Sequence, residues 1–363
     1  CCIRQDYIRQ RRALGLAMQR CDQPQLAAIG RVNLLCIIRI DSDVRRKALA
    51  TFSVLLGVKA LKKHFTVEHA DIIARCCKDS NSSICVHALR VLQRMTPVLT
   101  AKHALRVSEC CSHTNPRIRM KALQAHQGMR HLLLSENADS IAKCCADACE
   151  RVCLVAFTCI QCVQLLLTSS HALHFARGML HPSKQVRSNS LQLLQRVQHL
   201  LAADHADILT SGCISGSDAA RIDALDALKV LPGFPRFANE HVSRIVQCFG
   251  SEDKGIRDAA MRVLLEVQTT LTGDHVGMLV SFCNDFDEGV CIDALEAVHV
   301  FAGGTRDFHS GGHITPIVRS CLHRSRRVRL SAHHLLQGHK HLLTAAHADI
   351  LTSGCLSGSD AAR

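Results

Sequence analysis

Apolar residues recur along this chain at the spacing of an α-helix, in a longer and a shorter kind of segment. Between Val186 and Leu201 they form the stripe of an amphipathic helix of about four turns. The segment His69–Cys77 places Ala70, Ile73 and Cys76 on one face of a shorter helix. No segment shows the strict alternation that is typical of a half-buried strand. The pattern therefore predicts an all-α protein in which long and short helices follow each other.

The helix pair repeats along the chain about every 34 residues. A histidine marks the start of each shorter segment, with Asn137 in the one position where it is replaced: the series is His69, His103, His171, His205, His241, His275, His313 and His347. A fixed period of this length is typical of a stacked array of two-helix units. We expect an α-solenoid, a superhelix of about nine such repeats.

The recurring histidines raise the question of a metal site or a pH sensor. Equivalent residues of adjacent repeats are about 10 Å apart in stacked helices, whereas ligands of one metal ion lie about 2 Å from it. Threonines such as Thr100, Thr168 and Thr272 stand three residues before the histidine, at the position of a helix cap. We therefore expect each histidine to bond local backbone at the start of its helix.

The longer segments carry a family resemblance. The sequences DSDVRRKAL at Asp41–Leu49, NPRIRMKAL at Asn115–Leu123 and KGIRDAAMRVL at Lys254–Leu264 resemble the second helix of HEAT repeats. The resemblance implies two-helix HEAT-like repeats in a scaffold that presents an extended surface to partner proteins. An armadillo-type array, with a third helix per unit, is the alternative, although no third helix is evident.

The arginine of that motif is present in some repeats and absent from others. Arginine follows the first apolar residue at Arg45, Arg119, Arg187, Arg257 and Arg329. Cysteine replaces it at Cys85, Cys153 and Cys291. We therefore do not expect the continuous Asp/Arg ladder that the resemblance implies.

The periodic pattern extends over residues 1–363, which we interpret as a single continuous repeat array with a degenerate N-terminal unit at 1–40. Residues 199–221 and 341–363 differ at only three positions. The first copy continues into a further long helix, RIDALDAL, whereas the second is the end of the sequence. We expect the chain to be a fragment of a longer protein, truncated at both ends.

The chain contains 21 cysteines, which invites a disulfide or a metal interpretation. Many fall at one position of the shorter helix, and equivalent positions in adjacent repeats are about 8 to 10 Å apart, too far for a disulfide. Denser groups occur at Cys144, Cys145, Cys149 and Cys153, which bridge one turn, and at Cys159 and Cys162, which lie along the following helix. A zinc site needs two ligand pairs on loops that can converge, and the second pair lies on a helix already used for packing. We interpret the cysteines as small core residues, expect no metal, and infer an intracellular, reducing compartment, cytoplasmic or nuclear.

Motifs for catalysis or membrane insertion are missing from the sequence. It contains no Gly-rich phosphate loop, no GxSxG elbow and no HExxH helix, so we expect no enzymatic activity and no cofactor. Residues 152–176 lack acidic and basic side chains apart from histidine and are long enough to span a bilayer. They include glutamines and serines and stay in register with the repeats, so we expect no membrane partner.

Charge gives the only indication of a partner. The net charge is +13, and residues 1–63 hold 13 Lys and Arg against 4 Asp and Glu, a balance of +9. Two basic patches are candidates for partner binding: Arg9, Arg11, Arg12, Arg45, Arg46 and Lys47 in the first, and Arg319, Arg324, Arg326, Arg327 and Arg329 in the second. Such patches attract phosphates or acidic protein segments.

We favour a non-catalytic scaffold or adaptor that binds another protein or an acidic peptide segment. The alternative is a binder of the RNA or DNA backbone. It is less favoured, because the chain has no Trp and one Tyr, so it lacks the aromatic platforms on which single-stranded bases stack. A regulatory array of a larger enzyme is a further alternative.

Overall fold

The computed structural model describes residues 35–38, 41–57, 65–231, 239–302 and 312–357. These residues form α-helices and short 3₁₀ turns, with no β-strand among them. Most of the expected N-terminal unit at 1–40, including Arg9, Arg11 and Arg12, lies outside the described residues. The chain divides into two compact units, Cys1–His174 and Phe175–Arg363.

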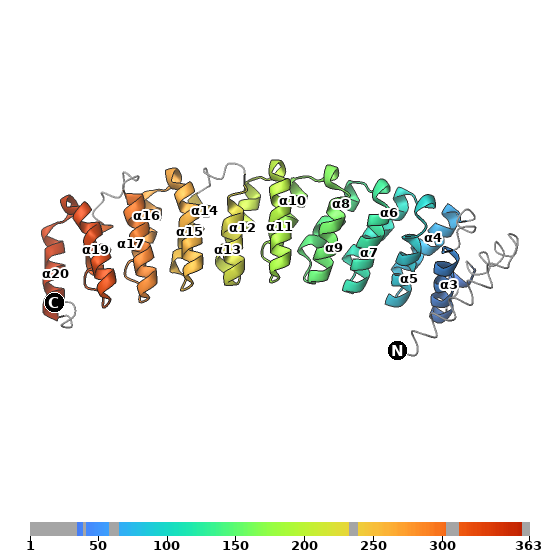
Figure 1. The fold of residues 1–363 in the computed structure, drawn as a ribbon, viewed down its shortest axis with the longest axis horizontal. Coiled ribbons are helices and arrows are strands. Elements are labelled where there is room, and N and C mark those ends of the chain that lie inside the picture. Colours follow the sequence, from blue (N-terminus) through green and yellow to red (C-terminus); the bar gives the residue numbers. More distant parts are fainter. Residues whose placement is uncertain (1–34, 39–40, 58–64, 232–238, 303–311, 358–363) are drawn as a thin grey trace. The chain divides into compact units, whose positions relative to one another are not determined.

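The first unit alternates long and short helices, as the sequence predicts. In chain order the helices are α3 (Ser42–Leu55), α4 (Val67–Arg75), α5 (Ser82–Leu92), α6 (Ala101–Glu109), α7 (Pro116–Gly128), α8 (Ser135–Lys143), α9 (Glu150–Ile160) and the first part of α10 (Ser169–Gly178). The longer helices α3, α5, α7 and α9 pack in series, and the shorter helices α4, α6 and α8 form a second layer beside them (Figure 1).

The second unit repeats this arrangement. Its helices after α10 are α11 (Lys184–Arg196), α12 (Ala203–Ser215), α13 (Asp218–Leu228), α14 (Asn239–Gln247), α15 (Lys254–Glu266), α16 (Gly273–Phe282), α17 (Glu288–Ala302), α18 (Ile314–Ser320), α19 (Arg326–Gly338) and α20 (Ala345–Ser357). Helices α11, α13, α15, α17 and α19 pack in one layer, and α12, α14, α16, α18 and α20 in the other (Figure 1). The protein is therefore an α-solenoid.

Short 3₁₀ turns connect the layers. Those that follow a short helix are Cys76–Lys78, Cys110–Ser112, Cys144–Ala146 and Cys248–Gly250. Those that follow a long helix are Thr96–Val98, Arg130–Leu132, Gln164–Leu166, Gln198–Leu200, Gln268–Thr270 and Lys340–Leu342. Polar residues start several long helices, as when Asn115 Oδ1 accepts from Arg117 N at 2.9 Å.

The core of each repeat combines branched aliphatic residues with small ones. In α7, Ile118, Ala122 and Leu123 are fully buried, as are Ala104 and Val107 of α6, the short helix that packs against α7. Alanine at these positions allows the backbones of the two helices to approach closely. The core therefore needs few aromatic side chains.

The repeating histidine caps the short helix in six repeats, which confirms the sequence interpretation there: His69, His103, His171, His205, His275 and His347. His313 differs, because it stands directly before α18 and makes no side-chain cap bond. In the six repeats, the histidine Nδ1 accepts a hydrogen bond from the backbone N–H three residues earlier, at 3.0 Å from Thr100 to His103 and at 2.8 Å from Thr168 to His171. At Asn137 the side-chain Oδ1 accepts from Leu134 N in the same way, at 2.7 Å. One of the backbone groups that a helix start leaves unpaired is thereby satisfied.

The far side of the same ring reaches the preceding repeat, which the sequence did not indicate. His241 Nε2 lies 3.0 Å from Asp207 Oδ1, and His275 Nε2 lies 3.0 Å from the carbonyl oxygen of Asn239. In His275 the Nδ1 accepts from Thr272 N at 3.0 Å, so the neutral ring carries its proton on Nε2 and donates to the Asn239 carbonyl oxygen. His275 therefore links its own helix start to the neighbouring repeat, and His347 does the same through Thr344 N and Thr315 Oγ1.

The replacement of histidine by Asn137 belongs to a buried polar network. Asn137 Nδ2 donates to Ser108 Oγ at 2.8 Å, and Ser108 Oγ lies 3.1 Å from His126 Nε2. Burial lowers the pKa of His126 to about 4, because the charged ring is poorly solvated there. His126 is thus held neutral in the folded protein.

We expect the folded state to lose stability in acid through His126. Its pKa is about 4 when folded and 6.5 when solvated, so the unfolded chain binds the proton first as the pH falls through 6.5. With respect to His126, the folded state keeps its full stability above pH 6.5, and it loses stability progressively as the pH falls towards 4. The test measures the free energy of unfolding in urea at a series of pH values. Between pH 4 and 6.5, His126→Gln should reduce the dependence of this free energy on pH by up to about 1.4 kcal/mol per pH unit.

The matched control is His131→Gln, at an exposed position of the following turn. It should leave the dependence of the unfolding free energy on pH unchanged. Equal slopes for the parent and His126→Gln would contradict the role of His126.

Candidate partner-binding surfaces

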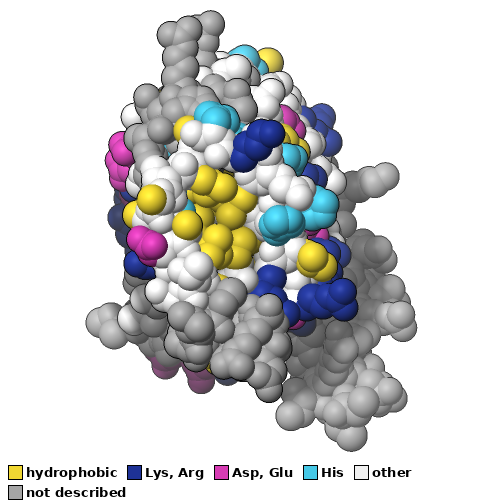
Figure 2. Space-filling view, turned by 90° about the vertical axis from the view of Figure 1, so that its left-hand side faces the viewer, with side chains coloured by type: hydrophobic (Ala, Val, Ile, Leu, Met, Phe, Trp, Pro, Cys, Tyr) yellow, Lys and Arg dark blue, Asp and Glu magenta, His cyan; other side chains and the backbone are white. Residues whose placement is uncertain are grey.

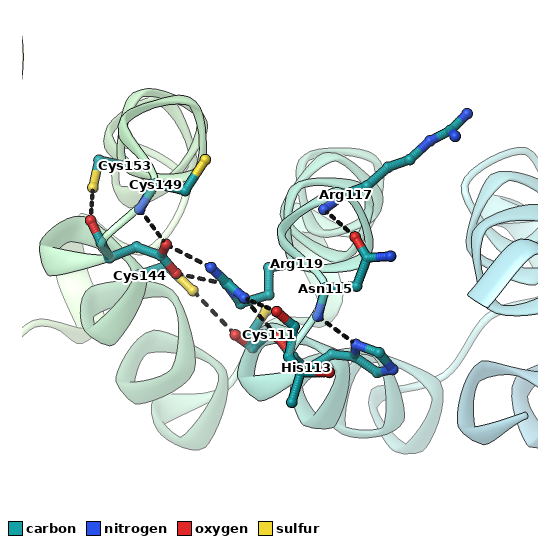
Figure 3. A network of polar contacts seen from close by, with 10 residues as sticks. Cys111, His113, Asn115, Arg117, Arg119, Cys144, Cys149 and Cys153 are labelled. Carbon is teal, nitrogen blue, oxygen red and sulfur yellow. Dashed lines mark hydrogen bonds and ion pairs between the residues drawn. The ribbon is translucent and has the colours of Figure 1, made fainter. Parts of the chain in front are cut away.

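An arginine near the start of a long helix joins two repeats in the first unit. Arg119 binds Asp147 of the next repeat through two hydrogen bonds, with Nε to Oδ2 at 2.6 Å and Nη2 to Oδ1 at 2.7 Å. Its Nη1 donates to the carbonyl oxygens of His113 and Thr114 at 2.7 and 2.9 Å (Figure 3). The bond to Asp147 raises the pKa of Arg119. One guanidinium thus holds its own turn and the next repeat together.

The same contact recurs elsewhere with different acceptors. Arg187 binds Asp223 at 2.6 Å and Arg257 binds Asp293 at 2.5 Å, and both arginines are nearly fully buried. Arg45, a member of the first predicted patch, binds Asp79 at 2.8 Å. We call Arg45, Arg119, Arg187 and Arg257 the inter-repeat arginines. Because each is held between repeats, the inter-repeat arginines serve stability.

Cysteine substitutes for only part of this contact. Sγ of Cys85 donates to the carbonyl oxygen of Asp79 at 3.0 Å, and Sγ of Cys153 to that of Asp147 at 3.0 Å (Figure 3). Each carbonyl belongs to the turn that an arginine would bind in other repeats. Burial raises the pKa of Cys85 to about 11 and that of Cys153 to about 12, so both thiols stay protonated donors at neutral pH. Cysteine repeats carry no guanidinium, which interrupts the ladder as expected.

Other thiols contact the preceding repeat diagonally, which the sequence did not indicate. Cys110 Sγ lies 3.5 Å from the carbonyl oxygen of Cys77, whereas the cysteine equivalent to Cys110 in that repeat is Cys76. Cys144 makes the same diagonal contact with Cys111. All cysteines that the structure describes are free thiols.

The basic patches separate into held and exposed side chains. In the first, Arg46 lies 3.1 Å from Asp43, while Lys47 is exposed. In the second, Arg329 Nη1 donates to the carbonyl oxygens of His323 and Arg324 at 2.9 and 3.0 Å.

The other members of the second patch lie around the turn between α18 and α19. Arg327 lies 3.5 Å from Glu288; the Arg327 side chain is largely exposed and that of Glu288 is partly exposed. Arg319 and Arg326 are exposed and have no acidic partner among the residues that the structure describes. Within the second patch, these two are therefore the arginines most available to a partner.

An exposed aromatic residue lies beside Arg324 and was not singled out from the sequence. Phe286 is 77% exposed, and the Arg324 guanidinium carbon lies 3.7 Å from the centre of its ring. Arg324 Nη2 also donates to the Phe286 carbonyl oxygen at 2.9 Å. The available signal was an isolated phenylalanine in the polar turn Asn284–Asp287.

Within the described parts of the chain, no group of three or more His, Cys, Asp or Glu side chains is placed to hold a metal ion. No described helix is both long and apolar enough to cross a membrane.

Comparison with known proteins gives similarity in solved structures alone. No protein-family model matches the chain, and no curated protein matches it. The structure of Kap121p is 15% identical, with a TM-score of 0.41, and the match covers 97% of this chain and 42% of that one. Kap121p bound to Pho4p is 13% identical with a TM-score of 0.42, over 87% and 37% of the two chains. An engineered protein is 13% identical with a TM-score of 0.35, over 92% and 96%.

The fold is assigned from the order and packing of the helices and not from these matches. The chain spans about two fifths of the Kap121p chain that it matches. The class of protein is a helical-repeat α-solenoid.

We expect replacement of an inter-repeat arginine to destabilise the fold. Arg119→Ala removes the donor to Asp147 Oδ2 and to two turn carbonyls, and the free energy of unfolding should fall by about 2 kcal/mol or more. Arg117→Ala, two residues away and exposed, should change it by less than about 0.5 kcal/mol. Chemical denaturation of both variants measures the difference, and equal effects would show that the contact is not structural.

Proposed function

We propose that the chain is a non-catalytic scaffold of the HEAT type that binds another protein. The two-helix repeats and the arginine motif at the start of the long helices support this assignment over an armadillo array. The recurrence of the motif over most of the sequence supports treating residues 1–363 as one continuous array. An α-solenoid offers an extended surface, which suits the binding of a partner chain.

The observation that carries the proposal is that exposed arginines and an exposed aromatic side chain occur together around the turn between α18 and α19. The inter-repeat arginines are engaged between repeats, whereas Arg319 and Arg326 are exposed without an acidic partner among the described residues. Together with Arg324 and Phe286 they define what we call the Arg319 surface. Arginine and aromatic side chains are enriched at the centres of protein interfaces.

The chemistry of the Arg319 surface suits an acidic peptide that also carries apolar residues. Exposed guanidinium groups pair with carboxylates, and the Phe286 ring offers an apolar contact. The neighbouring carboxylates are already engaged: Asp285 Oδ1 accepts from Asp287 N, Asp287 Oδ1 accepts from Val290 N, and Glu288 faces Arg327. We therefore place the main partner contact here rather than at Arg45, Arg46 and Lys47.

Free buried thiols support an intracellular, reducing compartment for this scaffold. Burial raises the pKa of Cys283 and of Cys321, and the cysteines of the described repeats pack as small core residues.

The test is binding of a labelled peptide of alternating Glu and Leu to the purified chain, followed by fluorescence anisotropy. We expect saturable binding that weakens at least about tenfold when Arg319, Arg324 and Arg326 are all changed to Ser. The matched control changes Arg90, Arg117 and Arg151 to Ser. These side chains are exposed in the first unit, and the control alters net charge equally.

Labelled RNA and duplex DNA are measured in parallel at about 50 and 200 mM salt. Binding of nucleic acid that falls steeply with salt, without binding of the peptide, would overturn the proposal in favour of a backbone-reading protein. Equal weakening of peptide binding in both triple variants would also overturn the proposal. The change in net charge, and not the position of the arginines, would then explain the weaker binding.

A further inference from the structure

The near-duplicate segments provide two copies of one helix in different surroundings. Helices α12 and α20 have the same length and start at the same place in their segments. Over their described side chains they differ only at Asp204, which corresponds to Ala346. A difference in exposure between the copies therefore reflects their neighbours.

Residues buried in α12 are exposed in α20. Ala206 and Thr210 are buried, whereas their counterparts Ala348 and Thr352 are exposed. Just before the helix, Leu201 is 7% exposed and its counterpart Leu343 is 40% exposed. Figure 2 views the side on which Figure 1 places α20, and hydrophobic side chains gather there in a central patch bordered by Lys, Arg and His.

The first copy shows which elements cover this face. Helix α12 packs against α13 and α14. On α14, His241 Nε2 lies 3.0 Å from Asp207 Oδ1, and Arg244 Nη1 donates to Thr210 Oγ1 at 3.2 Å. The second copy carries the same acceptors at Asp349 and Thr352.

Arg329 of α19 gives a second, independent observation, because it makes only part of the contact that the inter-repeat arginines make. Arg329 binds its own turn as Arg187 and Arg257 do. Those two then bind an aspartate of the next long helix through Nε, at 2.6 Å for Asp223 of α13. Arg329 has no acidic partner among the described residues.

We propose that the face formed by α19 and α20 docks a helix pair with the chemistry of α13 and α14. The first helix of the pair carries an apolar stripe like Ala220, Ala224 and Leu228, and an aspartate that meets Arg329. The second, shorter helix carries a histidine and, three residues later, an arginine, which meet Asp349 and Thr352. The proposal does not rest on the Arg319 surface.

Hydrogen exchange tests the docking face, with α12 as the internal reference. The two copies have nearly the same intrinsic exchange rates, so differences report burial and opening. In the parent chain, residues 345–353 should exchange faster than residues 203–211. In an extended chain in which residues 222–250 follow Arg363, the exchange of 345–353 should slow to that of 203–211.

A peptide of residues 216–250, added in trans to the full chain, tests the recognition itself. Ala348→Glu should weaken its binding at least about tenfold, because the counterpart Ala206 is buried. Ala346→Glu is the matched control, since its counterpart Asp204 is acidic and exposed, and it should change binding less than about twofold. Within the peptide, Asp223→Asn should weaken binding through Arg329.

Two results would overturn the inference. One is an extended chain in which residues 345–353 exchange as fast as in the parent. The other is a pair of variants, Ala348→Glu and Ala346→Glu, that bind the peptide equally. Slowed exchange in the extended chain without binding of the free peptide supports the docking face and shows that the helix pair must be tethered. Because Arg319, Arg324 and Arg326 are unchanged throughout, failure here is distinguishable from failure of the peptide-binding proposal.

Discussion

The short helices of this chain depend on burial between repeats for their existence. Helices α4, α6 and α8 are nine residues long, and a helix of that length is unstable alone in water because nucleation is costly. Each is stabilised by contact with a long helix and with the short helix of an adjacent repeat. The facing residues must therefore be small, as Ala70, Ala104 and Ala138 are, and this explains a chain with 3% aromatic residues.

Burial alone does not fix how one repeat sits on the next, because apolar contacts are not directional. The polar contacts supply that direction. Arg119 reaches both its own turn and Asp147, and His241 reaches Asp207. A slip between repeats would leave these groups buried without partners, which is costly. The capping histidine and the inter-repeat arginine therefore act as register contacts as well as local ones.

The contacts that these side chains make within their own repeat could be predicted from the sequence, whereas their contacts with a neighbouring repeat could not. A histidine at the third position of a helix reaches the preceding backbone whatever surrounds it, so the cap could be inferred from spacing. The partner of an inter-repeat arginine is 34, 28 or 36 residues away, at Asp79, Asp147 or Asp223. It lies in a turn in some repeats and in a helix in others, and no sequence spacing selects between them. The sequence also could not show which arginines of the second basic patch are held. Arg324 and Arg329 bind turn carbonyls, and a count of charged residues does not detect backbone acceptors.

Helices α12 and α20 show that the sequence of a helix in a repeat protein does not determine how far its apolar face is buried. Their described residues are nearly the same, yet Thr210 is fully buried and Thr352 is exposed. In a solenoid each repeat contacts only its neighbours, so stability is a sum of local and nearest-neighbour terms. The helix sequence determines which face is apolar, and the neighbouring repeat determines whether that face is core or surface. Partner binding at such a face and repeat stacking are then the same physical event, directed by the same arginine, histidine and aspartate contacts.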